Sequence, residues 1–546
     1  MTGSGQSARL ELHTTMVNRI SLLLTAACIL CGSAAAFEAP VLSRLTPGGG
    51  QRGSTVTARI DGKAGSESAL ANSVSGELQL RFTEKRDALE ISIPADASPG
   101  VHWIRLWNEQ GASELCPFIV GVIPEIAEQE SNDRLAEAVE LQLPGVTVNG
   151  VLEKSNDVDS YAVQLNAGET LVASMTANRI LGSPMDAILQ ITDPNGIVLA
   201  QNDDDITSDP LATFTAPQDG TWHVRTFAFP SAPNSTIGFA GAATYVYRLT
   251  LSTDAVVHHT EPIVRQQGTG DQRVLLRGWN ITVPEAVLAA DSNVLTGQFA
   301  LPRVVRSVSE PVFVEDQLES AVLPVPVALS GRLVEQRTDQ FQIDVTKGSR
   351  LRFRVECRRH DSLMDPVLRI HDSAGKQLQE SDDISRSDSD IDLVLTAPAD
   401  DRLTISLTDR FLVSGERYFY VLRISEPQPE CEVTTEGTAF TVPADGELRI
   451  PLTVSRLQGY AEKLGFEVSG LPEHLSAEAT ISEKSGDTAK KAEVTLKNTG
   501  GTAWSGEIRI QATGEESGTG FAVVWNAPDG SLQHRFWLTA IAAAAK

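Results

Sequence analysis

The chain has 546 residues, too many for one hydrophobic core, because single cores stop growing near about 250–300 residues. Hydrophobic residues make up 41% and charged residues 21%, as in globular proteins, and 27 prolines weigh against a helical protein. The net charge of −26 weighs against nucleic acids and anionic membranes, which need basic surfaces. Divalent cations are more natural partners, although an acidic surface also simply keeps an exported protein soluble.

Residues 1–36 have the pattern of a signal peptide. A short basic stretch precedes an apolar core at residues 20–31 and three alanines at 34–36, a small-residue cleavage site. Translation starts at either Met1 or Met16. The sequence thus predicts export to the periplasm, the cell surface or the medium. The apolar core is too short for a bilayer and no anchor follows at the other end, so no membrane span is expected.

Three cysteines remain after the predicted signal peptide, namely Cys116, Cys357 and Cys431. Their number is odd and their spacing wide, which is not the pattern of a disulfide framework. They also lack the paired spacing of structural zinc ligands.

Short segments of alternating polarity, separated by Gly, Pro, Asn and Asp, dominate the chain and predict an all-β fold of tandem β-sandwich domains. Shifts in composition divide the chain after residue 36 into an immunoglobulin-like β domain at 37–122, a β-sandwich at 123–254, a small bridging β module at 255–312, a second β-sandwich at 313–427 and a C-terminal immunoglobulin-like domain at 428–546.

Residues 124–254 and 313–427 form an internal repeat, and repeats are sought first because they set the domain count. The matching segments are 161–168 with 341–348, 185–196 with 364–375, 202–204 with 381–383 and 215–217 with 396–398. Two homologous sandwiches are the simplest explanation.

Both repeats end on an alternating aromatic strand, with Tyr245, Tyr247, Leu249 and Leu251 in the first and Tyr418, Tyr420, Leu422 and Ile424 in the second. Tyrosine pairs of this kind can form a binding platform. Since the tyrosines share a face with leucines, we interpret them as inward-facing core residues.

The order of short motifs in the first repeat resembles the bacterial pre-peptidase C-terminal (PPC) domain family. The motifs are Glu128-Gln-Glu-Ser-Asn-Asp133, Gly150, Asp157-Val-Asp-Ser-Tyr161, Ala167-Gly168, Asn202-Asp-Asp204 and Ala216-Pro-Gln-Asp-Gly220. The resemblance implies a jelly-roll-like sandwich that serves as an accessory domain of secreted proteases or cell-surface proteins and often binds calcium near its N-terminal linker. The second repeat is a degenerate copy.

Six oxygen-bearing side chains on two segments form the candidate calcium site: Glu128, Glu130, Asn132, Asp133, Asp157 and Asp159. Calcium takes six to eight oxygen ligands, and close carboxylates repel one another unless a cation neutralises them. In an extended strand, the first three would project to one side and meet the Asp-x-Asp pair. The alternative is a solvated acidic linker, with Asn132 or Asp133 capping a helix that follows.

Two further sites are weaker. Asn202, Asp203 and Asp204 can form a cation site, but a turn that satisfies its own backbone is more common for such a sequence. In the second repeat, alignment of Leu318 with Leu135 sets Glu315 and Asp316 opposite Asn132 and Asp133, and Pro311 and Phe313 opposite the two glutamates. Arg337 then replaces Asp157 while Asp339 preserves Asp159, so we expect this repeat to be free of metal.

The common local motifs of hydrolases, nucleotide-binding enzymes and zinc enzymes are absent from the sequence, although a triad assembled from distant residues would escape such a scan. His258 and His259 are adjacent on a predicted strand and would point to opposite faces, which favours a solvated domain boundary over a metal site.

We therefore expect a non-catalytic, exported accessory, binding or scaffold protein. Its ligand would be an extracellular polysaccharide or protein, and its oligomeric state is open. The alternatives are a structural spacer, an accessory subunit of a secreted peptidase system, and a hydrolase with a distributed site.

Overall fold

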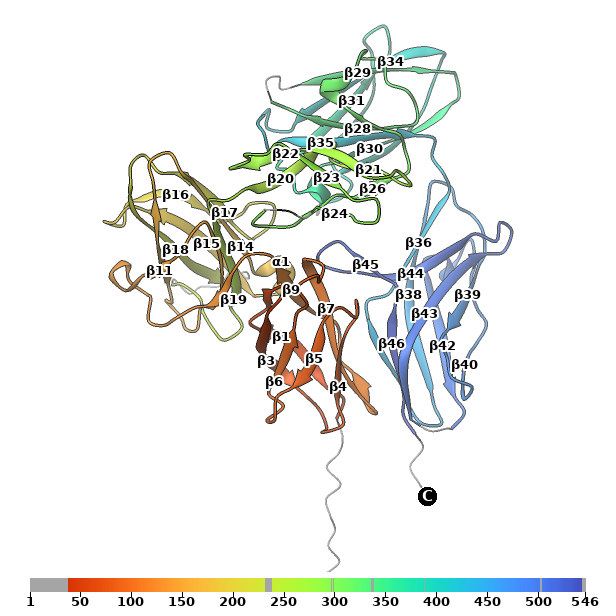
Figure 1. Cartoon of the computed structure of the whole chain (residues 1–546). Coiled ribbons are helices and arrows are strands. Elements are labelled where there is room, and N and C mark those ends of the chain that lie inside the picture. Colours follow the sequence, from red (N-terminus) through yellow and green to blue (C-terminus); the bar gives the residue numbers. More distant parts are fainter. Residues whose placement is uncertain are drawn as a thin grey trace, which may run out of the picture. The chain divides into compact units, whose positions relative to one another are not determined.

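The computed structural model describes residues 38–542, except 231–237, 296, 298, 335–337, 387 and 501–502. The signal-peptide prediction falls outside the described residues. The regular secondary structure of those residues is almost entirely β-strand, with one short α-helix, α1 (Asn178–Leu181), which confirms the predicted all-β fold of tandem sandwiches (Figure 1). Short 3-10 turns are η1 (Leu135–Glu137), η2 (Glu315–Gln317), η3 (Arg358–His360) and η4 (Asp487–Ala489). Within the described part, no helix has the length and apolarity needed to cross a membrane.

The first sandwich has two sheets, ordered β1-β3-β6-β5 and β2-β9-β7-β4, with β8 beside β7. Side chains from both sheets, among them Ile91, Leu106 and Phe118, are fully buried between them. The strands are β1 (Val41–Thr46), β2 (Gly49–Gln51), β3 (Thr55–Lys63), β4 (Leu70–Ser73), β5 (Gln79–Phe82), β6 (Ala88–Ser92), β7 (Gly100–Asn108), β8 (Gly111–Ala112) and β9 (Cys116–Gly121).

The first repeat has two five-stranded sheets, ordered β10-β12-β19-β14-β17 and β11-β13-β18-β15-β16. The first sheet contains β10 (Glu125–Ala127), β12 (Gly145–Val151), β19 (Val246–Ser252), β14 (Thr170–Thr176) and β17 (Leu211–Thr215). The second contains β11 (Val139–Leu141), β13 (Asp159–Leu165), β18 (Gly220–Pro230), β15 (Met185–Thr192) and β16 (Val198–Asn202).

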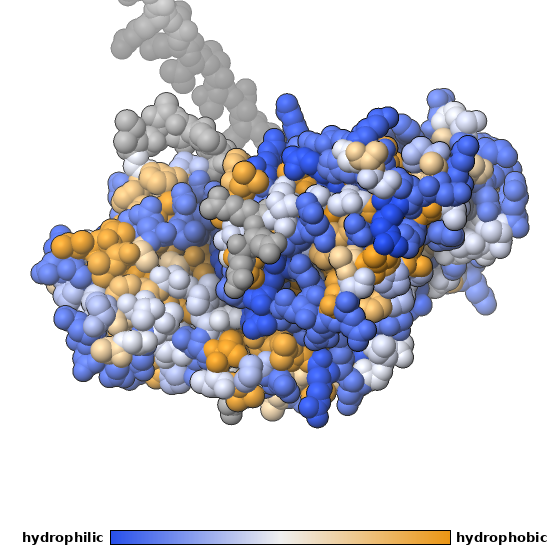
Figure 2. Space-filling view, turned by 90° about the horizontal axis from the view of Figure 1, so that it is seen from above, coloured by the Kyte–Doolittle hydropathy of each residue, from blue (hydrophilic) through white to orange (hydrophobic). Residues whose placement is uncertain are grey.

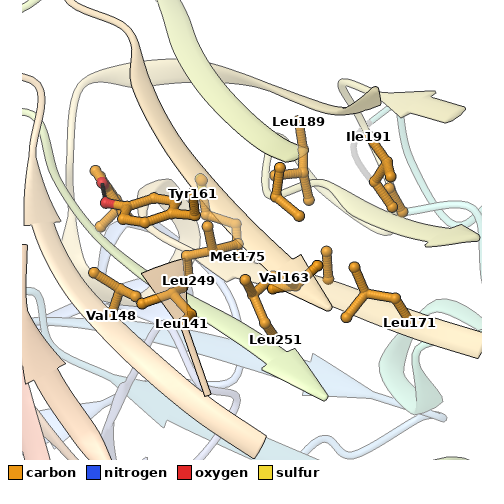
Figure 3. Close-up of a cluster of buried hydrophobic side chains, with 14 of the residues drawn as sticks. Leu141, Val148, Tyr161, Val163, Leu171, Met175, Leu189, Ile191, Leu249 and Leu251 are labelled. Carbon is orange, nitrogen blue, oxygen red and sulfur yellow. Dashed lines mark hydrogen bonds between the residues drawn. The ribbon is translucent and has the colours of Figure 1, made fainter. Parts of the chain in front are cut away.

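Alternate side chains of both sheets fill the core of the first repeat. Figure 3 shows Leu171, Leu249 and Leu251 among this cluster, with the Tyr161 ring at one end and its hydroxyl directed away from the leucines. The inward orientation predicted for the aromatic strands is confirmed: Tyr247 and Tyr420 are fully buried, while Tyr245 and Tyr418 are partly buried and pack against the cores.

The second repeat has the same strand order, β27-β28-β35-β30-β33 and β29-β34-β31-β32, so the internal repeat is also a repeat of topology. Only the counterpart of β11 is reduced, to a single parallel bridge between Val322 and Gln342. The strands are β27 (Val312–Val314), β28 (Val327–Arg332), β29 (Asp339–Val345), β30 (Arg350–Glu356), β31 (Pro366–His371), β32 (Gln377–Ser381), β33 (Ile391–Thr396), β34 (Asp401–Asp409) and β35 (Phe419–Ser425).

Small sheets lie between the repeats in sequence, and a larger sheet system follows them. The small sheets contain β20 (Val256–Glu261), β22 (Gln272–Trp279) and β23 (Glu285–Leu288), then β21 (Arg265–Gln266) with β26 (Ser307–Val308), and β24 (Val294–Leu295) with β25 (Arg303–Val304). The predicted domain boundaries remain predictions.

The C-terminal sheet system runs in the order β37-β46-β43-β44-β36-β38-β42-β40, with β39, β41 and β45 attached. Its strands are β36 (Glu430–Thr434), β37 (Ala439–Val442), β38 (Glu447–Leu457), β39 (Leu464–Ser469), β40 (Leu475–Ala477), β41 (Thr480–Ser482), β42 (Lys491–Asn498), β43 (Trp504–Gly514), β44 (Gly520–Asn526), β45 (Leu532–Gln533) and β46 (Phe536–Ala540). Cys116, Cys357 and Cys431 are all free and buried.

Candidate metal site

The first half of the candidate site is a loop, residues 128–134, that connects the two sheets of the first repeat. It follows β10, which pairs in parallel with β12 and ends at Ala127. Its first N–H donates to a carbonyl of β12, and an N–H of β13 donates to a loop carbonyl, both at 3.1 Å. The predicted alternation of Glu128, Glu130 and Asn132 along a strand is wrong, because the pleated strand stops before Glu128.

The second half is a tight turn that leads into β13. The Asp157 N–H donates to the Lys154 carbonyl at 3.1 Å, and Asp157 Oδ2 accepts the Glu153 N–H at 2.5 Å. Asn156 has a φ of 65°, in the left-handed region that asparagine tolerates better than most residues. The turn thereby places Asp157 and Asp159 at the start of the strand, both with no exposed surface.

Carboxylates from the loop and the turn meet. Glu130, Asp133 and Asp157 each present one carboxylate oxygen, and these atoms lie within 4.8 Å of one another. Several buried polar atoms of the two segments have no hydrogen-bond partner among the described residues: Asn132 Oδ1 and Nδ2, and the Oδ1 atoms of Asp133, Asp157 and Asp159. Buried polar atoms are almost always partnered in folded proteins, so this group of oxygens has the chemistry of a site for a hard cation.

Glu128 differs in its contacts from the other loop residues of the candidate site. Its Oε1 accepts the Val151 N–H at 2.8 Å, and its Oε2 lies 3.2 Å from the Tyr247 hydroxyl. The same hydroxyl lies 2.5 Å from Asp159 Oδ2 and 2.5 Å from the Tyr161 hydroxyl. Both Glu128 oxygens are thus occupied, and Glu128 and Asp159 form an inner pair of carboxylates joined by Tyr247.

Crowding and burial make the ionised forms of these carboxylates unfavourable. Burial, opposed by nearby donors, raises the pKa of Glu128 to about 7. Burial and the neighbouring Glu128 raise the pKa of Asp159 to about 9. The pKa of Glu130 is raised by burial and by Asp157, and that of Asp157 mainly by burial. A divalent cation would remove this penalty by pairing with the charged forms.

Among the described residues, Lys154 is the one cation that forms ion pairs with the cluster. Its Nζ lies 3.6 Å from Asp133 Oδ2 and 3.6 Å from Asp157 Oδ1, and its side chain is exposed. The two aspartates raise the pKa of the ammonium group. Sequence reasoning missed Lys154 and the hydroxyl of Tyr247; the signal for the latter was the tyrosine that recurs in both repeats.

The structure contradicts one alternative to a metal site and agrees with another. The helix-cap interpretation of Asn132 and Asp133 is wrong, because the N-cap of η1 is Arg134 and no side chain caps it. At the weaker site, Asn202 Oδ1 accepts the Leu211 N–H, and Asp203 Oδ1 accepts the N–H of the next residue. That turn satisfies its own backbone, as the sequence favours.

The two adjacent histidines do not behave as predicted. A β-bulge between Val257 and His259 breaks the alternation of β20, so the Nδ1 atoms of His258 and His259 lie 2.7 Å apart instead of on opposite faces. His259 is 1% exposed, so the expectation of a solvated pair is also wrong. Among the described residues, no histidine belongs to a group with metal-ligand geometry.

The second repeat corrects the alignment made from sequence. Gly150 pairs with Tyr247 and Gly331 with Tyr420, and counting back through the parallel pairs sets Glu315, not Pro311 or Phe313, opposite Glu128. The polar contacts agree, because Glu315 accepts the Arg332 N–H at 3.2 Å and lies 3.4 Å from the Tyr420 hydroxyl. That hydroxyl also donates to Asp339 at 2.8 Å.

The loop itself is missing from the second repeat. β27 ends at Val314 and η2 begins at Glu315, so Glu130, Asn132 and Asp133 have no counterparts. Arg337 lies outside the described residues. Within its described residues, the second repeat keeps the inner carboxylate pair and has no counterpart of the oxygens that Glu130, Asn132 and Asp133 provide.

Comparison with known proteins finds a family match for one part of the chain. Residues 157–228 match the model of the bacterial pre-peptidase C-terminal domain, so the resemblance drawn from the motifs is confirmed there. A probable subtilase-type serine protease of Deinococcus radiodurans is 34% identical over 97 residues, which are 18% of this chain and 13% of the protease. The match thus spans a small part of that relative.

Two solved structures are also similar. The pre-peptidase C-terminal domain of a collagenase from Bacillus anthracis is 13% identical, with 24% of this chain and 96% of that chain covered and a TM-score of 0.16. SGBP-B of a Bacteroides ovatus mixed-linkage glucan utilization locus is 11% identical, with 68% and 70% covered and a TM-score of 0.11.

Proposed function

We propose that this protein, whose residues 157–228 form a bacterial pre-peptidase C-terminal domain, is an exported accessory protein that binds calcium at the edge of that domain. The family match and the partial similarity to a subtilase-type serine protease support the accessory role. The predicted signal peptide supports export.

The buried oxygens that lack a hydrogen-bond partner are the observation that carries the calcium proposal. Asn132, Asp133, Asp157 and Asp159 each contribute one, and Glu130 adds a carboxylate oxygen close to two of them. These are the oxygen types that calcium prefers, and the negative charge of the set suits a divalent cation. The ion would contribute rigidity, because it would tie the loop to the start of β13.

Glu128 has a positioning role in this proposal. Its oxygens are occupied by Val151 and Tyr247, and Tyr247 also holds Asp159. It therefore orients a ligand instead of serving as one.

Calorimetry in EGTA and in millimolar calcium tests the proposal. Because calcium would bind the folded form preferentially, saturation at 100 times Kd stabilises by about 2.7 kcal/mol, and one unfolding transition should move up by several degrees. Asp157→Asn removes one charge at constant shape and should abolish most of that shift.

Asp339→Asn in the second repeat is the matched control and should leave the calcium response intact. If wild type shows the same melting profile in EGTA and in calcium, the site does not bind calcium. If Asp157→Asn and Asp339→Asn reduce the shift equally, calcium acts elsewhere.

A further inference from the structure

The C-terminal sheet system contains a groove of about 980 Å³ on the outer face of β36, β38 and β42, in the blue part of Figure 1. The segment that joins β40 to β41 lines it on one side. The end of β36 and the end of β44, with Trp525 and Asn526, line it on the other. The groove lies within one sheet system and shares no residue with the candidate metal site.

The alternation of β38 explains why the floor of the groove is polar. Ile450, Leu452 and Val454 are buried in the core, so Pro451 and Thr453 between them face outward and are exposed. Neighbouring strands continue the outward row, because Thr453 pairs with Thr434 on β36 and with Lys491 on β42.

Threonine is the most frequent residue type in the lining. Six threonines contribute to it: Thr434, Thr435, Thr453, Thr480, Thr488 and Thr495. A threonine hydroxyl can donate or accept a hydrogen bond, and so can a sugar hydroxyl. Such a surface can therefore bond to a polyhydroxylated ligand as donor or as acceptor.

The charges of the groove weigh against an ionic ligand. Glu478 pairs with Lys497 at 2.5 Å, and Glu493 pairs with Arg449 at 3.3 Å. These two acidic side chains are therefore neutralised locally, and the groove also contains Glu436 and Lys491, whose opposite charges balance. The outward row of Thr434, Thr453 and Lys491 is too polar for a purely apolar ligand.

Thr435 points to a ligand independently of the lining composition. Its side chain is 6% exposed and lines the groove, yet its hydroxyl has no hydrogen-bond partner among the described residues. By contrast, the Thr480 hydroxyl donates to the Glu493 carbonyl at 3.1 Å. A buried hydroxyl without a partner is uncommon. Because this oxygen has almost no accessible surface, a ligand hydroxyl would reach it only after the Thr435 side chain turns toward the groove.

We propose that this groove binds a neutral saccharide chain. The sheet face offers an open row of outward-facing, mostly polar side chains for successive sugar units, and Thr435 contributes a buried hydrogen-bonding group. Trp525 is partly buried against the core, and the part of its amphipathic indole that lines the groove can pack on a sugar. The proposal is independent of calcium.

Native affinity electrophoresis of the exported chain tests it, with soluble xyloglucan, laminarin, galactomannan and starch as probes and with EGTA in the gel. At least one polysaccharide should retard wild type. Thr453→Arg places a long side chain over the floor without touching the core and should weaken retardation at least ten-fold. Thr57→Arg, at an exposed threonine of β3, is the matched control and should migrate with wild type.

Thr435→Val gives a second measurement, because it keeps the side-chain shape and removes only the hydroxyl. It should weaken retardation several-fold without lowering the melting temperature. If none of the probes retards wild type, or if Thr453→Arg is retarded as strongly as wild type, the proposal is overturned. Binding of gelatin or casein that Thr453→Arg abolishes, without polysaccharide binding, would assign the groove to a peptide and also overturn it.

Discussion

Lys154 occupies the position of a competing cation at the candidate calcium site. Its Nζ lies 3.6 Å from carboxylate oxygens of Asp133 and Asp157. Calcium that binds these oxygens must displace the ammonium group or tolerate its repulsion. We predict that Lys154→Met raises calcium affinity roughly two- to five-fold, the range expected for one exposed charge pair. Titration calorimetry at low ionic strength measures it.

An exposed lysine of the second repeat, Lys376, provides the control for that measurement. Lys376→Met changes the net charge by the same amount far from the site in sequence and should leave calcium affinity unchanged. Equal effects of the two variants would mean that only the general charge of the protein matters. A loss of affinity in Lys154→Met would contradict the competing role.

The inner carboxylates of the second repeat predict an unusual pH dependence. Burial raises the pKa of Asp339 to about 6, and burial and Asp339 raise that of Glu315 to about 7. Both values exceed those of an unfolded chain, about 3.9 and 4.3, so the native state binds protons more tightly. The stability that comes from this tighter proton binding is complete below about pH 4 and is lost as the pH rises through about 6 to 7.

We therefore predict that this repeat loses on the order of 2 kcal/mol of stability between pH 5 and pH 8. Asp339→Asn cannot ionise and can still accept the Tyr420 hydroxyl, so its melting temperature should fall less over that range. Asp203→Asn, at an exposed aspartate of the first repeat, should follow wild type. A steeper fall for Asp339→Asn would contradict the assignment.

At the scale of strands, a glycine opposite a tyrosine makes the inner carboxylate pair possible. A Cβ at Gly150 would overlap the ring and hydroxyl of Tyr247, and a Cβ at Gly331 would overlap those of Tyr420. Each tyrosine therefore crosses directly over its glycine to reach the two carboxylates. The crossing recurs at the same register in both repeats.

We predict that Gly150→Ala and Gly331→Ala each destabilise by about 1–3 kcal/mol, because overpacking forces the buried tyrosine to move. Only Gly150→Ala should also weaken calcium binding, since Tyr247 holds Asp159 in place. Urea unfolding and calcium titration of both variants check this. Normal calcium affinity in a destabilised Gly150→Ala would separate the tyrosine from the site.

A structural feature could be predicted from the sequence where it follows the alternation of side chains along a strand. The period of two correctly indicated that Tyr247 and Tyr420 face the cores. It failed at Glu128, where β10 has already ended, and at His258, where a bulge interrupts β20. Neither a strand end nor a bulge leaves a reliable mark in residue type, because backbone pairing with another segment determines both.

The loop beside β10 shows the same limit. Its composition predicted a cation site. Glu130 and Asp133 do lie near Asp157, but backbone bonds to two different sheets hold the loop there instead of side-chain alternation. The sequence did not reveal that the second repeat lacks this loop. Glu315 and Asp316 can be aligned with Asn132 and Asp133, or Glu315 can be aligned with Glu128. Only the strand register decides between them.

On the scale of the whole molecule, separate cores divide the chain into units whose stability can change separately. Each repeat has its own buried cluster, around Tyr247 and around Tyr420. On the face shown in Figure 2, hydrophobic residues form separate patches among hydrophilic ones. The net charge of −26 is consistent with such a surface.

Separate cores predict that calcium protects one part of the chain only. Local stability in proteins follows contiguous cooperative units, so an ion that ties residues 128–134 to β13 should slow amide exchange there and in β10 and β12. Peptides from 312–345 contain the topological equivalents without the loop and serve as the internal control. Hydrogen exchange read by mass spectrometry, in EGTA and in calcium, should show protection confined to the first repeat. Equal protection of both repeats would mean that the loop is not what distinguishes them, because the inner carboxylates that they share would then be sufficient to bind the ion.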